Sequence, residues 1–227
     1  MYNPAAFKEE RVPVLHQLIR DHPLATLVVL GPGGLVANHV PMLVDADPGP
    51  LGTLRAHVAR ANPLWQTLSP EVQALAVFQG PEGYITPSWY RAKAESGKVV
   101  PTWNYAVVHA HGPLRAIEDQ EWLRRLVGDL TDSRERGRPG PWHVTDAPDD
   151  YIARQLGSIV GLEMRLTRLE GKWKMSQNRP AADRAGVVQG LRDAGDAASR
   201  DLADLVAGQS AAADAPPLRR SAEERAP

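Results

Sequence analysis

Residues 24–46 read LATLVVLGPGGLVANHVPMLVDA, which is two apolar runs separated by Gly31, Pro32, Gly33 and Gly34. Both runs are rich in leucine and β-branched valine, and β-branched residues favour extended strands. The Gly/Pro cluster between them is typical of a tight turn. The stretch therefore predicts a β-hairpin.

Four further segments predict strands, because each carries β-branched or aromatic residues in partial alternation. They span residues 51–59, 74–80, 103–117 and 161–174. About six strands with few long helices between them favour an antiparallel barrel over a doubly wound parallel sheet. The predicted fold class is mainly β with helices (α+β).

Helices are predicted at several places between and after these strands. Residues 10–21 have apolar side chains at helical spacing, and Asp119 can cap a helix that starts EWLRRLVGDL. Residues 149–155, 180–191 and 196–206 predict further helical segments. From Gly208 onward large apolar residues are nearly absent, so a disordered tail is expected. We therefore expect one domain over residues 1–191 and a helical, acidic, Ala-rich extension over 192–227.

Composition excludes several classes of protein. The 227 residues contain 26 Lys plus Arg against 27 Asp plus Glu, so nothing favours nonspecific binding to nucleic acid or to an anionic membrane. Cysteine is absent, which excludes disulfides and thiolate metal sites. The apolar runs are too short to span a bilayer and no signal peptide is recognisable, so we expect a soluble cytoplasmic protein.

The segment 84–105, YITPSWYRAKAESGKVVPTWNY, holds two Trp and three Tyr, whereas the whole chain has only two Phe. Aromatic walls with a few polar groups between them suit a flat heterocyclic ligand. The alternative is that these rings fill the core of a β-rich fold.

His57, Arg60 and Asn62 lie where a predicted strand ends and a helical turn begins, in LRAHVARANP. Asn62 suits an N-cap and Pro63 the first helical position, so free backbone N–H groups would lie beside His57 and Arg60. This arrangement suits a phosphate. An ordinary capped turn with a solvated Arg60 is the alternative.

Two other histidine motifs, at His39 and at His109 with His111, could also belong to a site. His39 ends the second strand of the hairpin and can face a pocket, or can be a half-buried histidine with a backbone partner. His109 and His111 would share one strand face. Because no third ligand is near them in the sequence, no metal site is predicted.

The segment KWKMSQNRP, residues 172–180, places hydroxyl, amide and guanidinium groups between a strand and a helix. Such groups can bind the polar edge of a heterocycle or an anion, although local capping would also explain them. The common nucleotide-binding and hydrolase motifs are absent.

Six motifs in this order resemble the PaiB family of FMN-binding negative transcriptional regulators, which are related to the pyridoxamine phosphate oxidases. They are MYNPAAF, NHVPMLVD, LRAHVARANPLW, VFQGPEGYITPSWY, VPTWNYAVVHAHG and KMSQNR. The resemblance extends to about residue 191. It implies a Greek-key antiparallel split β-barrel that binds FMN at a homodimer interface.

The resemblance also implies roles for residues of this chain. His57, Arg60 and Asn62 would contact the flavin phosphate. The residues that would flank the ring or the ribityl chain, or lie in the adjoining loop and corner, are His39, Ser88, Trp89, Thr102, Trp103, Asn104, Gln177, Asn178 and Arg179.

The sequence leaves the activity open between a flavin-dependent oxidoreductase and a non-catalytic dimeric transcriptional repressor. A haem-binding protein with His109 or His143 as axial ligand is a third alternative. Direct DNA binding is doubtful, because residues 181–227 contain six Arg against eight acidic residues and no helix-turn-helix is recognisable.

Overall fold

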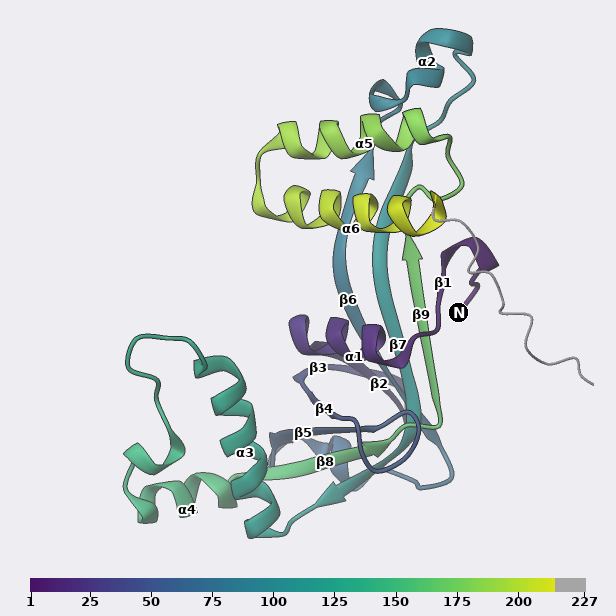
Figure 1. The fold of residues 1–227 in the computed structure, drawn as a ribbon. Helices are drawn as coiled ribbons and strands as arrows, with labels where there is room; N and C mark the ends of the chain where they lie inside the picture. Colours follow the sequence, from purple (N-terminus) through teal and green to yellow (C-terminus); the bar gives the residue numbers. More distant parts are fainter. Residues whose placement is uncertain (215–227) are drawn as a thin grey trace, which may run out of the picture. The chain divides into compact units, whose positions relative to one another are not determined.

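The computed structural model describes residues 1–214, so positions 215–227 of the expected tail lie outside the described residues. Its last helix, α6, spans Ala197–Asp214 and continues past residue 206, where we expected it to end. The described residues form α-helices and a mainly antiparallel sheet (Figure 1). This confirms the predicted α+β class.

The sheet has nine strands in the order β3-β2-β6-β7-β8-β5-β4, with β9 paired to β7 and β1 paired to β9. It is an open sheet, as expected of a split barrel. The strands are β1 (Lys8–Glu9), β2 (Leu24–Gly31), β3 (Gly34–Pro41), β4 (Leu43–Asp45), β5 (Thr53–Ala59), β6 (Gln73–Ile85), β7 (Thr102–Ile117), β8 (Ile159–Arg165) and β9 (Arg168–Lys174).

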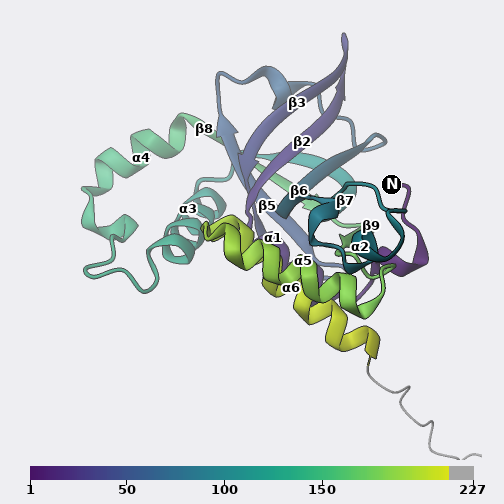
Figure 2. The same ribbon diagram turned by 90° about the horizontal axis from the view of Figure 1, so that it is seen from above.

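The predicted hairpin is confirmed as β2 and β3, which lie side by side in Figure 2, but the expected second run breaks at Met42 and its end forms β4, which pairs with β5. The register of β2 and β3 runs from Leu24 opposite Pro41 to Gly31 opposite Gly34, so Pro32 and Gly33 form the turn. On β2 the side chains of Ala25, Leu27 and Val29 are buried, as the alternation of a half-buried strand requires.

The helices agree with the sequence in most places. They are α1 (Val12–Asp21), α2 (Arg91–Ser96), α3 (Gln120–Glu135), α4 (Asp149–Gly157), α5 (Ala181–Ala194) and α6, with 3₁₀ turns at Ala5–Phe7, Pro63–Gln66, Pro87–Trp89 and Val144–Asp146. Asp119 caps α3 as predicted, since its Oδ1 accepts a hydrogen bond of 2.7 Å from the backbone N–H of Trp122.

Two local predictions need correction. Residues 161–174 were expected to form one strand, but the chain turns at Leu166 and Thr167 and makes two strands, β8 and β9. The Thr167 N–H donates to the carbonyl of His111 at 2.9 Å, which turns the chain back along β7. Helix α2 was not predicted, because it is only six residues long and lies among aromatic and polar residues that give no helical pattern.

The chain forms two compact units. Among the described residues, the first comprises Met1–Gly80 and Ala106–Trp173, and the second comprises Pro81–Tyr105 and residues 174–214. The domain boundary expected at residue 191 falls inside α5 and stays a prediction.

The core of the first unit is built on the sheet. Helix α1 buries Leu15 and Ile19 completely, and Phe78 of β6 is equally inaccessible. A satellite cluster of Leu123, Ile152 and Leu156 joins α3 to α4, with Trp122 and other partly buried side chains packed against it. The apolar stripe predicted on α3 is therefore used for packing.

In the second unit, α5 and α6 lie side by side in both views (Figure 1 and Figure 2). Helix α5 also carries Gly186 and Gly190 one turn apart, where Trp89 rests on the helix. A Cβ at Gly186 would lie 2.0 Å from the Trp89 carbonyl oxygen, and a Cβ at Gly190 would lie 2.3 Å from its indole ring. Only glycine permits this approach.

Gly190→Ala is expected to destabilise the protein by about 1–3 kcal/mol, because the added methyl group would overlap a ring held in a packed site. Gly128→Ala in α3 is the matched control, since its Cβ would meet nothing within 4 Å. That change should stabilise the helix by up to about 1 kcal/mol. Denaturant unfolding of both variants measures the change in stability. Equal midpoints would show that the packing of Trp89 does not need the space left by Gly190.

Candidate functional site

The sequence-predicted residues fall into two groups, one in each unit. The first group lies at the end of β5 and on β3. Asn62 caps the 3₁₀ turn Pro63–Gln66, with its Oδ1 accepting from the Leu64 N–H at 3.0 Å. Its Nδ2 donates to Oδ1 of Asn38 at 2.9 Å. The NHVP and ARANP motifs therefore meet in space, and His39, the neighbour of Asn38, is exposed on β3.

Arg60 is more constrained than a solvated surface arginine. Its guanidinium donates to Oε2 of Glu118 at 2.6 Å and to the carbonyls of Gly157 at 2.9 Å and Ile159 at 3.2 Å. Its Cζ also lies 5.8 Å from the ring centroid of Trp65. These contacts fix the guanidinium while leaving two of its five N–H groups for another acceptor.

His57 lines a cavity of about 290 Å³ together with residues of α3 and α4. Most of the lining is apolar, and it includes the rings of Trp142 and Tyr151. Nδ1 of His57 is buried and has no hydrogen-bond partner, and burial lowers the pKa of the imidazole below its ordinary value. A buried polar atom without a partner points to a missing ligand or water.

The shift at His57 makes stability depend on pH. Above pH 6.5 the imidazole is neutral in both states; below it the unfolded chain takes up a proton that the folded chain resists. Stability should fall as the pH drops below about 6.5, with at most about 1.4 kcal/mol per pH unit from this residue. His57→Gln should reduce that dependence in denaturant unfolding at several pH values. An unchanged dependence would contradict the burial argument.

The second group forms where β7 meets the turn between β9 and α5. Nδ2 of Asn104 donates to Oγ of Ser176 at 3.0 Å, and both residues are buried. Ser176 has a φ of 63°, an uncommon conformation for a residue other than glycine. Nζ of Lys174 donates to Oγ1 of Thr102 at 2.5 Å and to the carbonyl of Trp103 at 2.8 Å. The VPTWNY and KMSQNR motifs are thus joined.

Lys174 was not expected in this group, and Ser176 was expected only as the hydroxyl of the KWKMSQNRP segment. The sequence contained a signal for both, since they lie in the same KMSQNR stretch as the predicted residues. Their pairing with Thr102 and Asn104 depends on strand register, which the sequence did not give.

Trp103 and Tyr84 present an exposed aromatic pair in this unit. Their ring centroids lie 6.1 Å apart in an edge-to-face arrangement, and the side chains are 47% and 51% exposed. The Trp103 indole N–H donates to the Glu82 carboxylate. The two rings offer exposed apolar surface with a polar group at its edge.

The other predicted residues of the second group lie in the turn after β9 and in the loop before α2. Arg179 lies with its Cζ 4.7 Å from the ring centroid of Tyr90, and burial raises the pKa of that phenol. Oε1 of Gln177 accepts from the Met175 N–H at 2.6 Å, which caps the turn locally. Asn178 is exposed, and Oγ of Ser88 accepts from Nζ of Lys93 at 3.0 Å.

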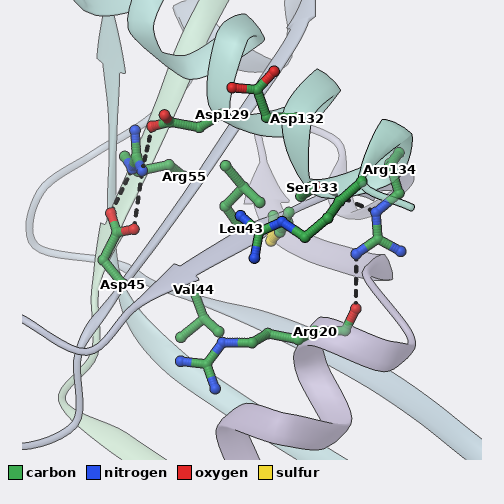
Figure 3. Close-up of a pocket in the computed structure, with 11 residues that line it drawn as sticks. Arg20, Leu43, Val44, Asp45, Arg55, Asp129, Asp132, Ser133 and Arg134 are labelled. Atoms are coloured by element: carbon green, nitrogen blue, oxygen red, sulfur yellow. Dashed lines mark hydrogen bonds and ion pairs between the residues drawn. The ribbon is translucent and has the colours of Figure 1, made fainter. Parts of the chain in front are cut away.

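A larger pocket, of about 550 Å³, lies in the first unit between β4, β5 and α3 (Figure 3). Arg55 links its acidic residues, donating to both oxygens of Asp45 at 2.5 and 2.9 Å and to Asp129 at 2.9 Å. The Asp45 hydrogen bonds, above all, raise the pKa of Arg55. No residue of either predicted group lines this pocket.

The open antiparallel sheet is that of a split barrel. Among solved structures, the chain is similar to the flavocytochrome Anf3 of Azotobacter vinelandii (TM-score 0.56, 12% identity, 79% of this chain and 75% of the other). It is also similar to the FAD and heme binding protein of Mycobacterium smegmatis (TM-score 0.55, 18% identity, 74% and 73% of the two chains). At these identities the likeness concerns the fold alone.

Residues 1–168 match the family described as "Putative FMN-binding domain". An uncharacterized protein of Aspergillus fumigatus is 35% identical over 251 residues, with 91% of this chain and 96% of the relative covered. The Protease synthase and sporulation protein PAI 2 of Bacillus subtilis is 28% identical over 206 residues at the same coverage. The chain belongs to this FMN-binding domain family, and the resemblance to the PaiB proteins is confirmed.

Within residues 1–214, none of the helices combines the length and the hydropathy that crossing a bilayer requires.

Proposed function

We propose that this protein binds FMN as a homodimer and acts as a flavin-dependent oxidoreductase. The observation that carries the proposal is the joining of VPTWNY to KMSQNR, which fixes an exposed tryptophan beside a lysine and a strained serine turn. Family membership supports a flavin as the ligand.

The phosphate is assigned to His57, Arg60 and Asn62. In support, Arg60 keeps two N–H groups for an acceptor after its contacts with Glu118 and two carbonyls. The partnerless Nδ1 of His57 is a further candidate contact. A phosphate would compete with the exposed Glu118 carboxylate for the same guanidinium, which is an exchange of one anion for another.

The isoalloxazine ring is assigned to residues of the second group, and His39, in the first unit, is assigned separately to the ribityl chain. The exposed face of Trp103 can stack on a flat ring, and the amide and hydroxyl groups nearby can bind its polar edge. Trp89 has a different part in the proposal: because its indole rests on Gly190, it positions the loop that carries Ser88. The site residues of the two units are tested separately below.

When bound, FMN would carry the electron chemistry, while the protein binds the ring, orients it and excludes water. No protein acid or base is needed for that role. Arg179 is the residue we assign to stabilising negative charge at the ring, because a guanidinium already in place acts without reorganisation.

The first test is a titration of the purified protein with FMN and with riboflavin, which lacks the phosphate. Trp103→Ala should weaken both ligands by about 5- to 100-fold, the worth of one stacked ring. Arg60→Gln should weaken FMN by about 10- to 100-fold and leave riboflavin nearly unchanged, because only FMN offers the charged acceptor. Quenching of fluorescence measures the affinity for each ligand, and the mass of the complex shows whether the protein is a dimer.

Two matched variants control this experiment. Tyr2→Ala removes another exposed ring, 85% accessible, and Arg154→Gln removes a surface guanidinium paired only with Asp150. Both should bind FMN as the unchanged protein does. Equal losses of affinity for FMN and riboflavin in Arg60→Gln would contradict the phosphate assignment. An unchanged affinity for FMN in Trp103→Ala would contradict the ring assignment.

A flavin-responsive negative regulator of transcription is the second candidate function, and the resemblance of the chain to the PaiB regulators favours it. The near-balanced charge argues against tight direct contact with DNA. Saturable, sequence-selective retardation of genomic fragments at moderate salt would favour the regulator over the oxidoreductase.

A further inference from the structure

Strands β7 and β9 bring together three side chains that the sequence holds far apart. His109 and His111 alternate on β7 and share one face, with ring centroids 6.4 Å apart. Glu170 lies on β9, which pairs with β7. One ligand atom from each of the three residues lies within 4.8 Å of the others. The missing third ligand of the His109 and His111 pair is therefore supplied by tertiary structure.

We propose that His109, His111 and Glu170 bind a divalent transition-metal ion such as Zn²⁺. Two imidazole nitrogens and one carboxylate oxygen form a donor set that suits Zn²⁺, Co²⁺, Ni²⁺ and Cu²⁺ and disfavours Mg²⁺ and Ca²⁺. Three protein ligands leave one tetrahedral position for water or another ligand. No residue assigned to the flavin belongs to this site.

The spacing of the cluster is close to what coordination requires. Bonds of about 2.0–2.2 Å to a tetrahedral ion bring the donor atoms to roughly 3.3 Å from one another. The observed separations, at most 4.8 Å, need only rotation of side chains whose backbones are held in paired strands. The residues are partly buried, which limits competition from water.

Burial, above all, lowers the pKa of both imidazoles. At Glu170 burial acts to raise the pKa, but Arg168, the Met1 ammonium and His111 together outweigh it and lower the pKa. Nε2 of His111 is buried without a hydrogen bond, and the Glu170 Oε2 lies 3.4 Å from it.

Arg168 competes for the same atoms. Its guanidinium lies 3.1 Å from Nδ1 of His111 and 3.2 Å from Oε2 of Glu170, which the Met1 ammonium also approaches at 3.6 Å. Since a guanidinium only donates, Nδ1 of His111 accepts and Nε2 carries the ring proton. Metal binding at Nε2 moves that proton to Nδ1 and requires Arg168, 53% exposed, to turn away. Arg168 therefore weakens the site.

The test is calorimetric titration of the full-length, chelator-treated protein without a histidine tag, using ZnCl₂ and, in parallel, MgCl₂. We expect one Zn²⁺ per chain and no Mg²⁺ binding. His111→Gln, His109→Gln and Glu170→Gln should each weaken Zn²⁺ at least as much as loss of an outer-shell partner, about 10- to 100-fold. Arg168→Ala should bind Zn²⁺ several-fold more tightly, which loss of a merely structural residue would not produce.

His143→Gln is the matched control, because His143 also lies beside a carboxylate, with Nδ1 3.1 Å from Oδ1 of Asp132. Zn²⁺ binding should survive this change. Absence of stoichiometric Zn²⁺ binding, or binding that persists in His111→Gln and Glu170→Gln, would overturn the proposal. Circular dichroism checks that each variant is folded. If His111→Gln or Glu170→Gln does not fold, Zn²⁺ binding by His109→Gln tests the site instead. The outcome does not depend on FMN binding.

Discussion

The pairing of β7 with its neighbours is the constraint on which the rest of this structure depends. The strand is 16 residues long and pairs with β6, β8 and β9. Every backbone N–H and C=O group of a buried strand needs a partner, so each neighbouring strand must keep its register along β7. Each motif that β7 carries is therefore held at a defined place opposite another strand.

Both chemically interesting clusters follow from this strand. Near its start, Thr102, Trp103 and Asn104 meet Lys174 and Ser176. Further along, His109 and His111 meet Glu170. In each case residues about 60 to 70 positions apart become neighbours because a strand returns beside β7. Cross-strand contact, rather than a local loop, builds the polar groups of this protein.

Arginine contacts show how the same side chain can serve stability and leave room for binding. Arg60, Arg55 and Arg168 each contact a carboxylate and at least one further acceptor. Exposed ion pairs contribute little to stability, so exchanging such a carboxylate for a ligand anion costs little. At Arg168 the same reasoning works in the opposite sense, because the guanidinium occupies positions that a cation would need.

The sequence by itself determined the hairpin, most strands, the Asp119 and Asn62 caps and the family, because these depend on local periodicity, capping chemistry and short motifs. It did not give the turn at Leu166 and Thr167 or helix α2, where no strong local signal exists. It also left His109 and His111 without a third ligand and did not reveal that Trp89 packs on Gly190. Only the tertiary structure decided these points, because they depend on strand register and on close approach to Gly190, both set by contacts between residues distant in the chain.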